Sequence, residues 1–135
     1  MKLVIDANSI IAALLKDSMA RAIIVGGALE LVSPDNIKNS IAKHEAYITA
    51  KAGITKEELD LLVPLLFKNI KVIPHSDYKN KIKQAEGIMI DDPEDVPYVA
   101  CYLALNCDGI WTNDNHYSNN PMIKVFKTKE VMTFL

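Results

Sequence analysis

Short apolar stretches alternate with longer helical ones along this chain, and that alternation constrains its fold more than any other feature. The apolar runs have the length of buried strands, and the segments between them are long enough to form helices. We predict five strands, at residues 2–5, 29–32, 70–73, 109–112 and 123–126. Strands joined by helical crossovers pair in parallel, so we expect a three-layer α/β/α domain around a central parallel sheet of about five strands.

Capping residues and prolines indicate where the helices begin and end. Asn8 is a candidate cap for the first helix, and Ser33 followed by Pro34 predicts the start of a helix that continues to about residue 52. Thr55 and Glu58 have the spacing of a capping box, and we expect a later proline at position 64 to kink or divide the helix that follows. Further helices are predicted at residues 19–26, 76–86 and 128–135, and in a segment that ends near residue 106.

The length and charge of the chain narrow its class. Its 135 residues suit one domain, residues 1–135, with a single core. No apolar run reaches the roughly 18 residues of a membrane span, and the apolar start is too short for a secretory signal, so we expect a cytoplasmic protein. The net charge of −2 and the single arginine argue against a surface coated in basic residues. A local basic rim remains compatible with these numbers.

Aromatic and cysteine side chains add little that is specific to a function. Tyr98 and Tyr117 are candidates for stacking on bases, whereas Trp111 lies in the middle of a predicted strand and is expected in the core. Cys101 and Cys107 are six residues apart on a predicted helix and do not share a face. We therefore predict small buried thiols there rather than a disulfide or a metal site.

Acidic residues follow two of the predicted strands. Asp6 comes directly after the first strand and Asp114 shortly after the fourth, so both stand at carboxyl ends, where parallel sheets bind ligands. Asp108 precedes the fourth strand and, at about 3.3 Å per residue, lies roughly 15–20 Å from Asp114. We therefore expect Asp108 to be a turn residue.

Two helices can bring further carboxylates to the same edge. Glu45 lies on the flank of an apolar helical stripe, where it is either paired with a cation or half-exposed to solvent. Asp95 shares a helix face with Val99 and Leu103, and this face should look toward the sheet. Asp92 and Asp95 both lie shortly before prolines, and each is also explained as a helix cap.

The candidate acids come from four separate parts of the chain: Asp6, Glu45, Asp95 and Asp114. If they meet, about four negative charges share one cleft, which requires cations or bound protons. Carboxylate oxygens favour the hard cations Mg²⁺ or Mn²⁺, while His75 and His116 fall in predicted loops and offer no metal-ligand spacing. One or two such ions can activate a water and stabilise the departing oxygen of a phosphodiester, so the residues alone suggest metal-dependent phosphoryl chemistry.

Four stretches of the chain resemble the motifs of a known family. The stretches LVIDANSIIAAL, HEAYI, DPEDVPYVACYLAL and DGIWTNDNHY occur in the order and at the spacings of PIN domains, over essentially the whole chain. The pairing of DDPEDVPYVA with DGIWTND is the specific part of this resemblance. PIN domains are α/β proteins with a central parallel sheet, and many are Mg²⁺- or Mn²⁺-dependent ribonucleases. The resemblance implies an endoribonuclease that hydrolyses phosphodiester bonds of single-stranded RNA. Lys38, Lys43 and Lys51 would then either face RNA or form an ordinary solvated helix face.

The resemblance also implies a role for each acid. Asp6 and Asp114, the acids after the first and fourth strands, would be the main metal ligands. Glu45, as the acid of the central helix, and Asp95, as the acid opening the helix before the fourth strand, would complete the ligand shell or orient the water. Glu45 is followed by a small alanine where many members have a larger apolar residue, so this match is looser.

Three further residues accompany these acids in the resemblance. Asn8 and Thr112 fall where the family often places polar residues that support the metal site. Asp92 lies close enough to Asp95 to be the family acid in its place, and we prefer Asp95 because DVPYVA supplies the helix register that faces the sheet.

The resemblance has implications for partners as well. Many small PIN proteins are toxins of toxin–antitoxin pairs, of the VapC type, which commonly form homodimers and are held inactive by a separate antitoxin chain. Others act in RNA processing, and the sequence does not separate these two. A non-catalytic binding module with the same fold and a different Mg²⁺-dependent phosphoryl-transfer domain are the remaining alternatives.

Overall fold

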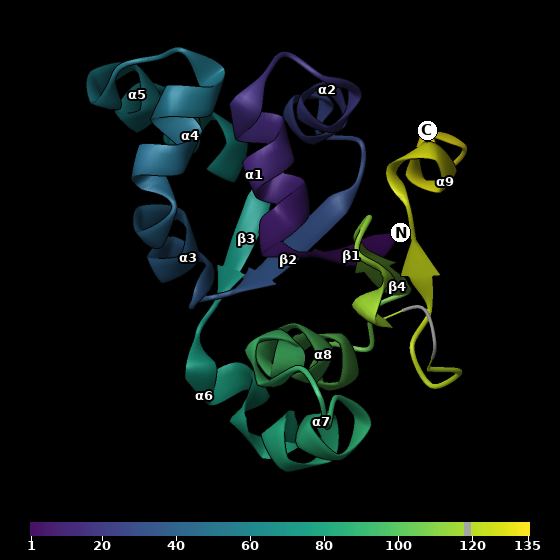
Figure 1. The fold of residues 1–135 in the computed structure, drawn as a ribbon. Coiled ribbons are helices and arrows are strands. Elements are labelled where there is room, and N and C mark those ends of the chain that lie inside the picture. Colours follow the sequence, from purple (N-terminus) through teal and green to yellow (C-terminus); the bar gives the residue numbers. More distant parts are fainter. Residues whose placement is uncertain (118–119) are drawn as a thin grey trace.

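The computed structural model describes residues 1–117 and 120–135, and its centre is a sheet of five parallel strands (Figure 1). The strands are β1 (Lys2–Ile5), β2 (Glu30–Pro34), β3 (Ile70–Ile73), β4 (Gly109–Trp111) and β5 (Val125–Phe126). Their order across the sheet is β3-β2-β1-β4-β5. The predicted α/β/α class with a five-stranded parallel sheet is confirmed.

The direction in which successive strands are added to the sheet reverses beside β1. The chain builds outward from β1 through β2 to β3, and then returns to place β4 on the other side of β1. Ile5 is paired with Trp111 at the carboxyl ends of these two strands. Open α/β sheets form a crevice at such a switch point. The residues that follow β1 and β4 are therefore brought side by side at the edge where a ligand would bind.

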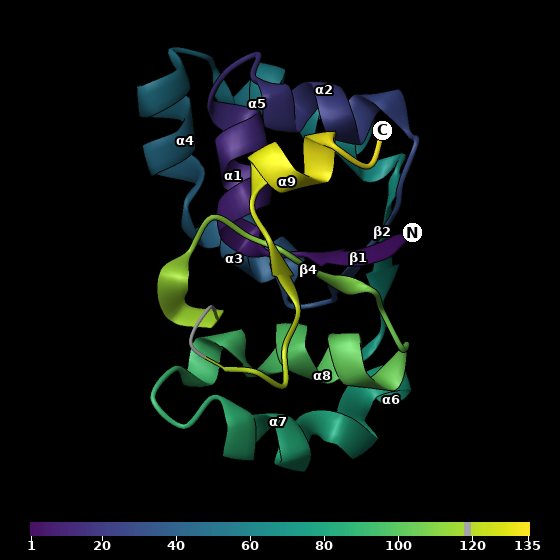
Figure 2. The same cartoon turned by 90° about the vertical axis from the view of Figure 1, so that its right-hand side faces the viewer.

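Helices cover both faces of the sheet (Figures 1 and 2). One layer contains α1 (Ala7–Leu15), α2 (Met19–Gly26), α3 (Ile37–Lys43), α4 (Glu45–Ala52), α5 (Lys56–Phe67) and the C-terminal α9 (Thr128–Met132). The other contains α6 (His75–Tyr78), the 3₁₀ turn η1 (Lys79–Lys81), α7 (Ile82–Ile88) and α8 (Val96–Ala104). On β1, Leu3 and Ile5 pack into the first layer and Val4 into the second, which is the alternation expected of a strand covered on both faces.

Helix starts follow the capping chemistry of the sequence, with one correction. Asp6, not Asn8, caps α1, because Oδ1 of Asp6 accepts a hydrogen bond from the backbone N–H of Ser9 at 2.9 Å. The predicted capping box of Thr55 and Glu58 is present at the start of α5. The proline at position 64 lies inside α5 but does not divide it.

The segment that follows β2 differs most from the prediction. Ser33 and Pro34 belong to β2 itself, since the Ser33 hydroxyl donates to the carbonyl of Ile5 at 3.1 Å and Pro34 is paired with Ile73. The predicted helix from Pro34 to residue 52 is in fact two helices, α3 and α4, which are separated at His44. His44 has φ −100° and ψ 10°, outside helical geometry, and its ring Nδ1 lies 2.8 Å from a carbonyl one turn earlier.

The second layer is also more broken than predicted. The segment predicted as one helix over 76–86 consists of α6, η1 and α7. The acidic stretch forms a short 3₁₀ turn, η2 (Pro93–Asp95), before α8 begins at Val96. Cys101 and Cys107 are buried free thiols, as expected, and Trp111 is fully buried. No helix in the described parts of the chain has the length and apolar character needed to cross a membrane.

Candidate active site

Asp6 is placed in the core by the end of β1 and the start of α1. Its carboxylate is only 3% exposed, and it accepts hydrogen bonds from the Ser9 backbone N–H and from the Thr112 hydroxyl. Burial raises the pKa of Asp6 from 3.8 to about 6, against the lowering effect of these hydrogen bonds from Thr112 and Ser9. A carboxyl group whose ionisation is opposed by burial, at the edge of a sheet where ligands bind, is typical of functional sites.

Asp114 is joined to Asp6 through two polar neighbours. The Thr112 hydroxyl, which donates to Asp6, accepts a hydrogen bond from the backbone N–H of Asp114 at 2.9 Å. The Asn8 side-chain amide donates to Oδ2 of Asp114 at 3.1 Å. Thr112 thus connects the two acids, and Asn8 holds the Asp114 side chain from the first turn of α1.

Asp95 and Asp92 reach the same place from η2 and the residue before it. The Asp95 side chain is 20% exposed and the Asp92 side chain 34%. Burial raises the pKa of Asp95, the neighbouring Tyr117 hydroxyl opposes that rise, and the negative charge of Asp92 adds to it. Oδ2 of Asp95 is buried and accepts no hydrogen bond from any described residue.

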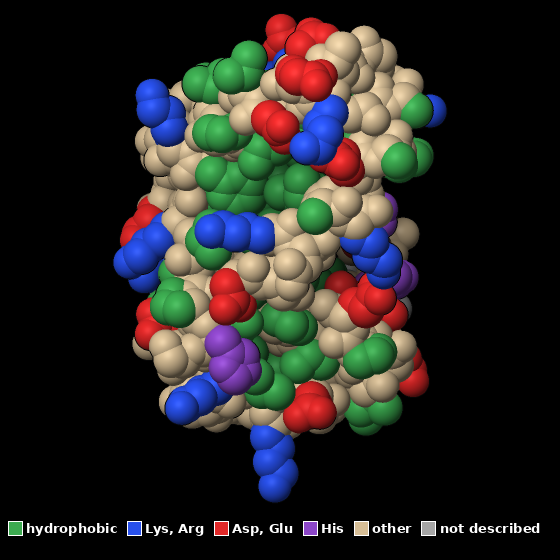
Figure 3. All heavy atoms as spheres, turned by 90° about the vertical axis from the view of Figure 1, so that its left-hand side faces the viewer, with side chains coloured by type: hydrophobic (Ala, Val, Ile, Leu, Met, Phe, Trp, Pro, Cys, Tyr) green, Lys and Arg blue, Asp and Glu red, His purple; other side chains and the backbone are tan. Residues whose placement is uncertain are grey.

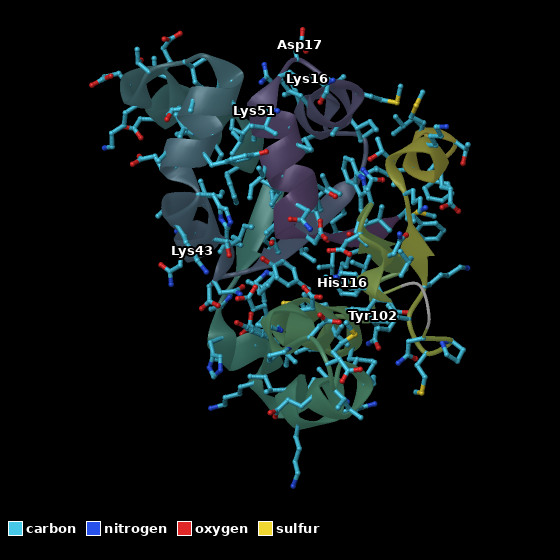
Figure 4. All side chains as sticks on the ribbon, in the orientation of Figure 1. Lys16, Asp17, Lys43, Lys51, Tyr102 and His116 are labelled. Carbon is cyan, nitrogen blue, oxygen red and sulfur yellow. The ribbon has the colours of Figure 1, made fainter. Side chains whose placement is uncertain are left out.

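His116 lies among these carboxylates, on the 3₁₀ turn η3 (Asn115–Tyr117) that follows Asp114 (Figure 4). Its Nδ1 is 3.2 Å from Oδ2 of Asp114, 3.5 Å from Oδ2 of Asp95 and 3.7 Å from Oδ1 of Asp92. The charge of Asp114 raises the pKa of His116, and the charges of Asp92 and Asp95 add to this effect. The sequence offers no metal-ligand spacing around His116, as stated above, because its neighbours are close in space and only Asp114 is near in sequence.

These side chains line one open cavity of about 490 Å³. Its walls come from the loop after β1, α1, α3, the turn before α8 and the loop after β4: Asp6, Ala7, Asn8, Ile11, Ser40, His44, Asp92, Pro93, Glu94, Asp95, Tyr98, Asp114 and His116. A smaller polar pocket adjoins it and shares Ser40, His44 and Glu94 with it. That pocket also contains Lys43, one of the lysines named above as candidates for facing RNA.

Glu45, the fourth predicted acid, lies outside this cavity. Its side chain is 39% exposed, and its Oε1 lies 4.0 Å from Nζ of Lys56. It lines a separate pocket between α3 and α5, on a face where hydrophobic side chains gather among lysines and acids (Figure 3). The break at His44 ends α3 before Glu45, so Glu45 belongs to α4 and not to the single long helix that was predicted. Instead of an acid, the α3 segment contributes Ser40 and His44 to the cavity.

The two tyrosines predicted as candidates for base stacking are not available at the surface. Tyr98 is 3% exposed and Tyr117 is 1% exposed, and both hydroxyls are buried without a hydrogen-bond partner among the described residues. Burial raises the pKa of both phenols, so they remain protonated donors under the floor of the cavity. Tyr117 is part of the core, and Tyr98 lines the cavity but exposes too little of its ring to stack on a base.

The donors of this cavity fit a divalent cation. Ligand atoms of Asp92, Asp95 and His116 all lie within 4.8 Å of one another, and the unpaired Oδ2 of Asp95 is one of the buried acceptors that a cation would satisfy. Asp114 adds a further carboxylate at 3.2 Å from the imidazole. Several carboxylates that converge without a lysine or arginine of their own are the ligands that Mg²⁺ and Mn²⁺ prefer.

Comparison with known proteins places the chain in a family. No curated protein matches it. A family model described as PIN domain matches residues 4–133, which include every residue of the acidic cavity. The match covers nearly the whole chain and agrees with the five-stranded parallel sheet. The chain therefore belongs to the PIN-domain family, a family of nucleases.

Proposed function

We propose that this protein is a divalent-metal-dependent endoribonuclease that hydrolyses phosphodiester bonds of single-stranded RNA. The observation that carries the proposal is the meeting of Asp6, Asp95 and Asp114, from three distant segments, in one cavity at the carboxyl edge of the sheet. Such a cluster is unstable unless cations or protons compensate it. A nuclease family and an acidic cavity together favour metal-dependent hydrolysis over binding alone.

Each residue has a distinct task in this proposal. The ion or ions would be held by Asp95, Asp114 and Asp92. Asp6 would accept the hydrogen bond from Thr112 and add a negative charge on the side of the cavity nearest the core. When bound, Mg²⁺ or Mn²⁺ supplies the charge that stabilises a phosphodiester under attack by water. Asn8 keeps the Asp114 carboxylate turned into the cavity.

The substrate strand would lie along the adjoining polar pocket. This pocket shares Ser40 and His44 with the acidic cavity and adds the ammonium group of Lys43, which can pair with a backbone phosphate. The net charge of −2 does not favour a broad duplex-binding surface. A narrow polar path with one cation suits a single strand better than a helix.

The test is cleavage of a labelled single-stranded RNA by purified protein with Mg²⁺, with Mn²⁺ and with a chelator. Cutting is expected only with a divalent ion, and Asp6→Asn should abolish it while the circular dichroism spectrum remains that of the wild type. Equal cutting by wild type and Asp6→Asn would reveal a contaminating nuclease and contradict the proposal.

We also propose that the protein forms a homodimer and pairs with a separate antitoxin chain, as the toxin of a toxin–antitoxin pair. Support comes from the family, many small members of which are toxins of this kind. Light scattering on purified protein tests the dimer. Growth arrest on expression, relieved by co-expression of a short neighbouring gene, tests the toxin role, and an RNA-processing component would cause no arrest.

One observation favours a second candidate, a non-catalytic module that keeps the fold. The α3 segment supplies Ser40 and His44 to the cavity where the prediction placed an acid, so the charge of the site is lower than expected. Calorimetry with Mn²⁺ distinguishes the two candidates, since a binding module of this kind would take up no ion.

A further inference from the structure

His116 combines two properties that an ordinary surface histidine lacks. Its side chain is 55% exposed, yet its Nδ1 is turned toward three carboxylates from two segments, Asp92 and Asp95 at η2 and Asp114 after β4. The position of the ring is supported by its own backbone, because the N–H of His116 donates to Oδ1 of Asp114 at 3.0 Å. One carboxylate thus anchors the backbone of the turn with one oxygen and faces the imidazole with the other.

The separations of Nδ1 from these oxygens are close to those of neighbouring ligands around one ion. An octahedral ion with ligands at about 2.1 Å keeps neighbouring ligand atoms about 3 Å apart. Nδ1 of His116 lies 3.2, 3.5 and 3.7 Å from its three carboxylate oxygens, and the ligand atoms of Asp92, Asp95 and His116 all lie within 4.8 Å of one another. One of these oxygens, Oδ2 of Asp95, is buried and has no hydrogen-bond donor among the described residues.

We propose that Nδ1 of His116 is a direct ligand of the active-site ion, and that this nitrogen makes the site select Mn²⁺ over Mg²⁺. The inference rests on the proposed function, because it assumes that the cavity holds a divalent ion. Mg²⁺ prefers an all-oxygen shell, whereas imidazole nitrogen is a better ligand for first-row transition ions. A ligand shell of three carboxylates and one imidazole should therefore bind Mn²⁺ more tightly than Mg²⁺, whereas carboxylates alone would hold both ions with similar geometry.

The opposing interpretation is that His116 only balances the charge of the acids. Both interpretations agree on the contacts of the ion-free protein and differ once an ion is bound. A balancing cation would leave when Mn²⁺ enters, whereas a ligand would remain in contact with the metal. A measurement on the Mn²⁺-loaded protein therefore decides between them without any assay of RNA cleavage.

The experiment is pulsed electron paramagnetic resonance on protein loaded with Mn²⁺, which detects nitrogen nuclei bound to the ion. Wild-type protein should show a coupling to ¹⁴N that is replaced by a ¹⁵N coupling when histidine is labelled with ¹⁵N. His116→Asp, which offers oxygen in place of nitrogen, should lose the coupling. His75→Ala is the matched control, since His75 is also exposed beside an acid, with its backbone N–H donating to Asp35, but lies outside the cavity.

Calorimetric titration of the same proteins measures selectivity. Loss of a ligand should cost at least the roughly 10–100-fold that loss of an outer-shell partner costs. The ratio of Mn²⁺ affinity to Mg²⁺ affinity should therefore fall at least about tenfold in His116→Asp and stay unchanged in His75→Ala.

The outcomes separate this inference from the proposed function. Bound Mn²⁺ without a histidine coupling, a coupling that persists in His116→Asp, or equal affinity of the wild type for both ions would overturn the role of His116 and leave a metal-dependent nuclease intact. Failure of the wild type to bind Mn²⁺ at all would overturn both. The ¹⁵N-histidine measurement on His44→Ala, which removes the other imidazole that lines the cavity, assigns the coupling to His116 even if His116→Asp folds poorly.

Discussion

The Asp6 carboxylate links the site to the stability of the fold through pH. Its pKa is 3.8 in an unfolded chain and about 6 in the folded protein. Between these values the folded state binds more protons than the unfolded state. The stabilising effect of the protonated carboxyl is therefore complete below pH 3.8 and is lost as the pH rises through about 6.

Asp6→Asn should remove this pH dependence, since the amide cannot ionise. In the presence of a chelator, the free energy of unfolding of the variant relative to the wild type should rise between pH 4 and pH 7 by up to about 3 kcal/mol, at about 1.4 kcal/mol for each pKa unit. Urea denaturation at four pH values within this range measures the difference. A difference that does not vary with pH would mean that folding leaves the pKa of this carboxyl unchanged, and would contradict the shift caused by burial.

A second prediction ranks the acids by their place in the cavity. Asp95→Asn should lower kcat/KM about a hundredfold or more, because it removes a ligand whose side chain is only 20% exposed and whose Oδ2 is buried. Asp92→Asn should cost less, since that side chain is more exposed. Glu45→Gln should leave cleavage close to the wild-type rate, because Glu45 faces Lys56 in another pocket. A large loss in Glu45→Gln with little loss in Asp95→Asn would require a different site.

At the scale of elements, the sequence predicts strands and the acids attached to them better than it predicts helices. Strand ends locate Asp6 and Asp114 because parallel strands place their carboxyl ends at one edge. The sequence does not predict that Glu45 lies outside the cavity or that His116 lies inside it. In both cases the cause is a segment with irregular backbone geometry. The helix breaks at His44, and a 3₁₀ turn redirects His116, and neither event has a proline or glycine to mark it.

The strand β2 shows a related limit of local patterns. Ser33 followed by Pro34 has the composition of a helix start, yet both residues extend the strand. Pro34 is at the end of its ladder, and Asp35 donates its N–H to Ile73 at 2.9 Å, so the missing N–H of proline costs no sheet hydrogen bond. Tertiary pairing with β3, which a local pattern does not contain, decides the outcome.

The contact between β4 and β5 provides a prediction at this scale. A Cβ on Gly109 would lie 2.4 Å from a ring carbon of Phe126 and 3.1 Å from the carbonyl oxygen of Lys124. Gly109→Ala should therefore destabilise the protein by about 1–3 kcal/mol in chemical denaturation. The matched control is Gly87→Ala in α7, where a Cβ meets nothing within 4 Å and should stabilise by about 0.4–1 kcal/mol. Equal effects of the two substitutions would contradict the close packing of Phe126 on β4.

The whole molecule brings its acids together only when the sheet is complete. Asp6 follows β1, Asp95 precedes α8 and Asp114 follows β4, so no fragment of the chain contains the site. The mutual repulsion of these carboxylates opposes folding, and among the cavity residues His116 places an imidazole nitrogen within 4 Å of three of them. A divalent ion that binds the folded state alone should therefore shift the folding equilibrium of the entire domain.

Mn²⁺ at a hundred times its dissociation constant should stabilise the protein by about 2.7 kcal/mol. For a domain of this size that corresponds to a rise in Tm of roughly 8–10 °C. Thermal unfolding followed by circular dichroism measures the shift, with NaCl at equal ionic strength as the control for simple screening of surface charge. Asp95→Asn should abolish most of the rise, because the ion then loses the ligand whose Oδ2 is buried. A rise of the same size with NaCl, or an undiminished rise in Asp95→Asn, would show that the ion acts on general surface charge and not at the acidic cavity.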